Sequence, residues 1–179
     1  MSTSALIPVE EYLRTIYEPD AEYVDGELVE RNVGEFDHSR LQSLIDRALG
    51  EFEKSHKLCV LVEQRMRVAD TATRKRYRIP DVLVLVRPFR KTPVLLEPPA
   101  MVIEILSPDD RMSMMLVKVA DYENFGIHCI FVIDPAQQVL FKAEAGGLIP
   151  VPDCTVRLAT ATGEISVDLK PLFAELDAE

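Results

Sequence analysis

The stretch MVIEILSPDDRMSMMLVKVADYENFGIHCIFVID (Met101–Asp134) decides the fold of this 179-residue chain. Its two ends, MVIEILS and HCIFVID, are continuous apolar runs, which are typical of strands buried on both faces. The apolar spacing from about Asp110 to Phe125 predicts a helix between them, and Gly126 is a suitable residue to end it. A strand, a helix and a second strand form a βαβ unit, so we expect the two strands to be parallel neighbours.

Helices and strands are also expected on both sides of this unit. Before it we expect a helix over Val9–Tyr17, a hairpin over Glu22–Arg31 that turns at Asp25-Gly26, a helix over about His38–Lys54, and a second hairpin formed by Cys59–Val68 and Tyr77–Val86. After it we expect short strands at Val139–Ala143, Thr155–Leu158 and Glu164–Val167, and a helical turn at Pro171–Leu176. The pattern predicts one α/β domain over residues 1–179, with a mixed sheet flanked by helices and a core over about residues 9–143.

The composition narrows the class of protein. Three widely spaced cysteines and three histidines favour neither disulfides nor a zinc or histidine-rich metal centre. The chain shows neither a signal peptide nor a run of about 18 apolar residues, so we expect a cytoplasmic protein without a membrane span. The net charge of −10 disfavours nucleic-acid binding through a diffuse basic surface.

Two carboxylates interrupt apolar strands. Asp81 opens the strand IPDVLVLV, and Glu104 lies inside MVIEIL on the same face as Val102 and Leu106. A buried carboxylate must be paired, protonated or bound to a metal, and two that converge on one point would suit Mg²⁺. The alternatives are that Asp81 caps the start of a strand and that Glu104 is a core acid in a salt bridge.

Lys118 lies in the predicted helix that follows the Glu104 strand. A crossover helix lies across the sheet, so the ammonium group could reach towards Glu104. From spacing alone, a boundary lysine that extends its charge to solvent is the favoured interpretation.

A basic segment lies inside this acidic chain. Residues 65–91 contain nine basic side chains and two acidic ones, so they could hold a phosphate backbone, or they could form a solvated loop. The candidates for nucleic-acid binding are Arg65, Arg67, Arg74, Lys75, Arg76 and Arg78.

The ordered set of these motifs resembles the PD-(D/E)XK nuclease superfamily and, within it, the bacterial Uma-two-type restriction endonuclease family. The similarity covers roughly residues 9–141. It is carried by the EEYL helix, the EYVDGEL hairpin, the helix entered at His38, the PDVLVL and VIEILSP strands, and the run KVADYENFGIHCIFVIDP. The superfamily motif has a lysine two residues after the glutamate, where this chain has Leu106, but the Uma-two-type family is similar to this chain in placing that lysine on the following helix.

The resemblance implies a restriction-endonuclease-like fold and a Mg²⁺- or Mn²⁺-dependent endonuclease that acts on nucleic acid, with DNA favoured. It implies that Asp81, Glu104 and the backbone carbonyl of Ile105 bind the metal and that Lys118 is catalytic. Glu22 and His38 match further positions of the family's site.

Two other functions stay open from the sequence alone. One is a non-catalytic binding module that keeps the nuclease fold, and the other is a metal-dependent hydrolase of another phosphate ester. The sequence also leaves the oligomeric state of the protein open, and a symmetric homodimer is one alternative.

Overall fold

The computed structural model describes residues 6–31 and 35–178. Its helices are α1 (Val9–Arg14), α2 (Phe36–Gly50), α3 (Met112–Phe125) and α4 (Lys170–Asp177). Its strands are β1 (Ala21–Val24), β2 (Glu27–Glu30), β3 (Leu58–Val62), β4 (Met66–Asp70), β5 (Lys75–Arg78), β6 (Val82–Val86), β7 (Met101–Ile105), β8 (Ile130–Asp134), β9 (Val139–Glu144), β10 (Gly147–Pro150), β11 (Thr155–Thr160) and β12 (Gly163–Asp168). The predicted mixed α/β class is confirmed.

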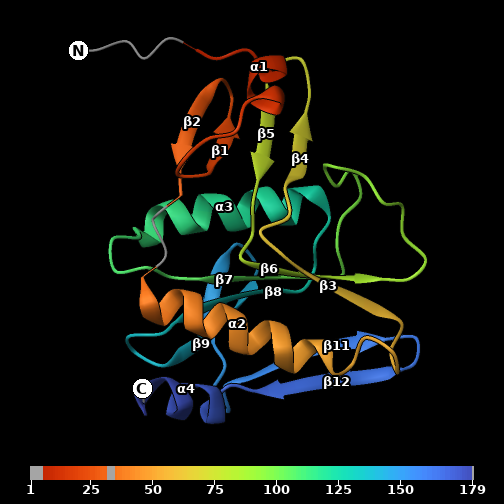
Figure 1. Cartoon of the computed structure of the whole chain (residues 1–179), viewed down its shortest axis with the longest axis vertical. Coiled ribbons are helices and arrows are strands. Elements are labelled where there is room, and N and C mark those ends of the chain that lie inside the picture. The colour runs from red at the N-terminus through yellow and green to blue at the C-terminus, as the bar shows by residue number, and fades with distance from the viewer. Residues whose placement is uncertain (1–5, 32–34, 179) are drawn as a thin grey trace.

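The predicted βαβ unit lies at the centre of a six-stranded sheet with the order β10-β9-β8-β7-β6-β3 (Figure 1). β7 and β8 are parallel neighbours, with Val102 opposite Ile130, and α3 connects them as expected. Gly126 follows α3 with a φ of +100°, a conformation that glycine adopts without the steric penalty of a side chain. β10 was not predicted, because a four-residue strand that contains a glycine and a proline has little strand signal.

The predicted antiparallel pairing of Cys59–Val68 with Tyr77–Val86 is confirmed, but each of the two stretches is divided between two sheets. β3 pairs with β6 in the six-stranded sheet, whereas β4 pairs with β5 in a four-stranded sheet of order β2-β1-β5-β4. The first stretch breaks near Glu63, which has a φ of +52°, and the second at Pro80, whose nitrogen cannot donate a ladder hydrogen bond. The chain therefore changes sheet immediately before Asp81.

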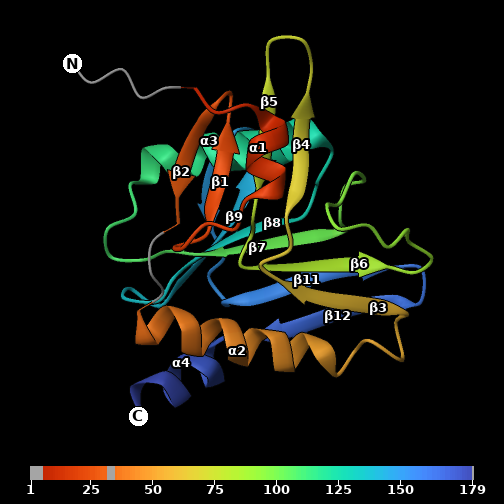
Figure 2. The same ribbon diagram turned by 45° about the horizontal axis from the view of Figure 1, so that its top comes forward.

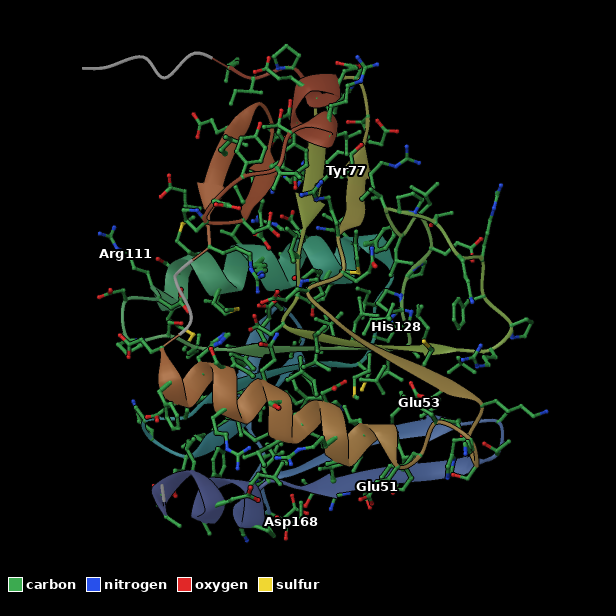
Figure 3. All side chains as sticks on the ribbon, in the orientation of Figure 1. Glu51, Glu53, Tyr77, Arg111, His128 and Asp168 are labelled. Atoms are coloured by element: carbon green, nitrogen blue, oxygen red, sulfur yellow. The ribbon has the colours of Figure 1, made fainter. Side chains whose placement is uncertain are left out.

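The four-stranded sheet carries the predicted β1–β2 hairpin. Asp25 and Gly26 form its turn, both with positive φ, as tight two-residue hairpin turns require. Tyr23 of β1 and Tyr77 of β5 pack with Tyr12 of α1 in an aromatic cluster, and Figure 3 labels Tyr77 in this sheet.

Each face of the six-stranded sheet packs against different elements. α2, α4 and the β11–β12 pair cover one face, whereas α3 and the four-stranded sheet lie on the other (Figures 1 and 2). Val84 packs towards α2 and Leu85 towards α3, as the alternation of a strand requires. The same alternation places Asp81 and Glu104 on the α3 side.

The hydrophobic core continues beyond the predicted limit near residue 143. Val156, Ile165 and Phe173 belong to the same buried cluster as α2 and the six-stranded sheet. Along the part of the chain that the structure describes, no helix has the length and apolar character needed to cross a membrane.

Candidate active site

A pocket of about 640 Å³ opens where α3, the start of α2 and the two larger sheets meet. The five residues named as catalytic candidates all line it, together with Ile105, the predicted backbone ligand: Glu22, His38, Asp81, Glu104 and Lys118. Arg111 lines it as well, and Figure 3 shows this side chain at the exposed beginning of α3. The fold therefore brings together side chains from β1, α2, β7, α3 and the loop between β5 and β6.

Lys118 lies between two buried glutamates. Its Nζ atom donates to Glu104 Oε2 at 2.9 Å and lies 2.9 Å from Glu22 Oε1. The side chain is only 13% exposed, so it does not extend to solvent as a boundary lysine would. Burial alone would lower the pKa of this ammonium, but the surrounding carboxylates raise it above its ordinary value.

Glu104 is the acid of the pocket whose pKa is raised, whereas the pKa values of Glu22 and Asp81 are lowered. Burial, together with the negative charges of Asp81 and Glu22, raises its pKa to about 7, despite the opposing effect of Lys118. Tyr122 donates its hydroxyl to the other oxygen, Oε1, at 2.5 Å. The sequence pattern of two acids in apolar strands thus corresponds to a site in which one carboxyl group, that of Glu104, is poorly stabilised as an anion.

Asp81 differs from Glu104 because surrounding protein groups stabilise its negative charge. The backbone N–H of Ile105 donates to Oδ2 at 2.7 Å, and Arg31 donates to Oδ1 at 2.6 Å. His38 Nε2 lies 3.3 Å from Oδ2, and Gln42 donates to the backbone carbonyl of Asp81. Burial favours the neutral acid, but the hydrogen bond from His38 and the nearby cations hold the pKa below its usual value.

Glu22 connects the pocket to a buried ion-pair network. Arg78 donates to Glu22 Oε2 at 2.7 Å, while its Nε and Nη2 atoms donate to Asp121 Oδ2. The backbone N–H of Ile79 donates to Glu22 Oε1, the oxygen that also faces Lys118. Arg78 therefore fixes the carboxylate that holds the ammonium of Lys118.

The predicted nucleic-acid-binding residues are not a free basic surface. Arg78, one of these candidates, is buried, and its guanidinium is enclosed by two carboxylates. Arg74 and Arg76 both contact Asp121, and Arg76 also pairs with Asp25. The remaining ion pairs join Arg65 to Asp20 and Arg67 to Asp70. Among residues 6–31 and 35–178, Lys75 forms no side-chain ion pair.

Sequence reasoning missed Tyr122, Asp121 and Arg31, and it did not foresee the buried partners of Arg78. Tyr122 stands four residues after Lys118, so helical spacing could have placed both on one face. Asp121, Arg31 and the partners of Arg78 had no such signal, because these ion pairs join residues more than 30 positions apart in sequence.

The donor atoms fit a hard divalent cation. Asp81 and Glu104 supply carboxylate oxygens to one pocket, which is the ligand type that Mg²⁺ and Mn²⁺ prefer. Because burial raises the pKa of Glu104, a cation beside this carboxyl group would stabilise its charged form. Buried His38 Nδ1 has no hydrogen-bond partner among the described residues. Those residues contain no cluster of three or more His, Cys, Asp or Glu side chains suited to a metal, so such a site would rest on two carboxylates, backbone and water.

Fold and pocket together define a mixed α/β protein with a buried acidic pocket. The chain belongs to the Uma2 family, whose model is described as "Putative restriction endonuclease" and matches residues 9–162. This confirms the family that the motifs resemble. The fold is similar to that of a crystal structure described as a putative nuclease belonging to DUF820 from Anabaena variabilis ATCC 29413. The TM-score is 0.77 at 23% sequence identity, with 95% of this chain and 99% of that chain covered. No curated protein sequence matches the chain.

Proposed function

We propose that this protein is a Mg²⁺- or Mn²⁺-dependent endonuclease that hydrolyses phosphodiester bonds of nucleic acid, with DNA as the favoured substrate. The observation that carries the proposal is the position of Lys118, whose ammonium lies 2.9 Å from Glu104 in a pocket shared with Asp81. Membership of the Uma2 family supports the same reaction class.

The metal would be held by the carboxylates of Asp81 and Glu104 and by the backbone carbonyl of Ile105. A bound divalent cation supplies a Lewis acid and lowers the pKa of a coordinated water. The other residues hold this arrangement in place. His38 contacts Asp81 and fixes its carboxylate, whereas Glu22 restrains the ammonium of Lys118.

Lys118 would act on the substrate itself. Its ammonium can orient the attacking water and stabilise the negative charge that develops on the scissile phosphate. Because Glu22 and Glu104 raise its pKa, the lysine keeps its proton, so we assign it charge stabilisation rather than the role of general base.

Replacing Lys118 with methionine tests this role. The variant keeps an apolar stem inside the buried site but loses the charge, so we expect cleavage of plasmid or short DNA strands to fall about 10²–10³-fold. Binding of Mn²⁺ should persist, because an ammonium cannot ligate a metal. The control is Lys170→Met, which removes an exposed lysine of α4 outside the pocket and should leave cleavage unchanged. Equal cleavage by Lys118→Met and the wild type would remove Lys118 from the mechanism.

One observation favours a second candidate function, a binding module without catalysis. All four carboxylate oxygens of Asp81 and Glu104 already accept contacts from protein groups. Divalent-metal binding separates the two functions, because a binding module has no need of it. A wild-type protein that neither binds Mn²⁺ nor cleaves any nucleic acid would support the binding module.

A further inference from the structure

Arg31 lies at the pocket immediately after β2. Its backbone N–H donates to the carbonyl of Asp20, and its guanidinium extends to Asp81 Oδ1 at 2.6 Å and to Glu63 Oε1 at 3.3 Å. The side chain is 15% exposed. Besides Asp81 and Glu63, the charges of Glu104 and Glu22 also raise the pKa of Arg31, against the effect of burial. Arg31 and Lys118 are therefore both counter-ions of the pocket acids.

The guanidinium binds an oxygen that the proposed metal site requires. A Mg²⁺ ion would need a carboxylate oxygen of Asp81 at about 2.0–2.1 Å. Oδ2 already accepts from the backbone N–H of Ile105, which belongs to a β-strand and cannot move independently, so Oδ1 is the available ligand. A divalent cation beside Oδ1 would also repel the positive charge of Arg31.

The attachment of Arg31 also differs from that of Arg78. Arg78 is 4% exposed, and three of its nitrogens donate to two buried carboxylates. Arg31 contacts Asp81 through one nitrogen, and its second acid, Glu63, is 52% exposed. Arg31 can therefore leave Asp81 while the buried Arg78 network stays intact.

We infer that Arg31 is a phosphate-binding residue of this site, held on Asp81 until a divalent cation takes that carboxylate oxygen. The planar guanidinium offers two parallel N–H groups, which match the oxygens of a phosphodiester. A phosphate bound beside the cation would restore the negative charge that Arg31 loses when it leaves Asp81. This inference rests on the proposed function and adds the residue that couples metal binding to substrate binding.

The first part of the inference is that Arg31 occupies Asp81 until a cation binds. Metal affinity in the absence of nucleic acid tests this part. We expect Arg31→Met to bind Mn²⁺ about tenfold or more tightly than the wild type by calorimetry, because a competing positive charge has been removed. The matched control is Arg47→Met, which removes an α2 arginine that pairs with Glu175 outside the pocket and should leave Mn²⁺ affinity unchanged. Mn²⁺ affinity in Arg31→Met that equals or falls below the wild-type value would overturn the inference.

The second part of the inference is that the released guanidinium binds phosphate. Nucleic-acid affinity in the presence of Mn²⁺ tests this part. The probe is a fluorescent DNA duplex with hydrolysis-resistant phosphorothioate linkages, measured by anisotropy. We expect Mn²⁺-loaded Arg31→Met to bind this duplex about tenfold more weakly than the loaded wild type, although it holds the metal more tightly. Unchanged duplex affinity would overturn the inference by itself.

Arg31→Lys provides a second variant if Arg31→Met does not fold. Lysine keeps the positive charge but not the planar pair of donors, so Mn²⁺ affinity should stay near the wild-type value while duplex affinity falls. If the Arg31→Lys variant binds the duplex as tightly as the wild type, the proposed role of the guanidinium is overturned. Failure of the proposed function gives a different result: wild type, Arg31→Met and Asp81→Asn would then all fail to bind Mn²⁺, and the inference would fall with it.

Discussion

The pocket and the β4–β5 hairpin are both built from ion pairs, but their charges balance differently. In the pocket, Glu22, Asp81 and Glu104 surround Lys118 and Arg31, and burial with this acid excess raises the pKa of Glu104 to about 7. In the hairpin, several arginines share a few acids. Arg74, Arg76 and Arg78 all contact Asp121, while Asp25 and Glu22 accept further hydrogen bonds from Arg76 and Arg78.

This difference shows why a count of charges along the sequence does not locate a binding surface. The hairpin is the most basic segment of the chain, yet most of its arginines neutralise acids that come from other elements. The pocket is acidic, but an acidic pocket is what a divalent cation requires before a phosphate can approach. Whether a charged side chain is available for binding depends on its partners in the folded protein, not on the composition of its segment.

The largest effect that would test this comparison is expected from Arg78→Met. Removing the guanidinium leaves Glu22 and Asp121 buried without their main cation, which typically costs about 3–5 kcal/mol of stability. Denaturant unfolding measures the loss. The control is Arg157→Met, which removes an exposed ion pair with Asp153 and should change stability little. An Arg78→Met protein as stable as the wild type would show that the hairpin is not held by this network.

A smaller effect is expected from metal binding to the pocket. A cation that binds only the folded protein stabilises it by about 2.7 kcal/mol at a concentration of one hundred times its Kd. We expect Mg²⁺ or Mn²⁺ to raise the melting temperature of the wild type, and Asp81→Asn or Glu104→Gln to remove most of that increase. An unchanged metal response in either variant would mean that the two carboxylates do not share a cation.

The smallest effect is expected from reversing the exposed charges of the hairpin. Lys75→Glu should alter stability by no more than about 0.5 kcal/mol, because surface substitutions away from buried ion pairs rarely cost more. Adding Arg74→Glu should cost more than that, because it sets a carboxylate beside buried Asp121. Arg74 already contacts Asp121, so duplex affinity should fall less than in Arg31→Met, with a slightly weaker dependence on salt. A larger loss of affinity than in Arg31→Met would make the hairpin the main contact for nucleic acid after all.

Local sequence patterns were enough to predict the central βαβ unit, the β1–β2 hairpin and the positions of α2 and α3. These elements depend on local signals: continuous apolar strands, helical spacing, Asp25-Gly26 at a turn and Gly126 after a helix. The sequence also singled out Asp81 and Glu104, because an acid inside an apolar strand is conspicuous without any knowledge of its neighbours.

The pairing of the charged side chains, by contrast, depends on the folded arrangement of distant elements. The division of two long strands between two sheets, at Glu63 and Pro80, brings Arg78 under Glu22 and turns Asp81 towards α3. The partners of Arg31, Arg78 and Asp121 lie more than 30 residues away in sequence, so no local pattern could reveal them. An ion pair forms wherever the packed backbone brings two charges within a few ångströms, and that distance is fixed by the whole fold.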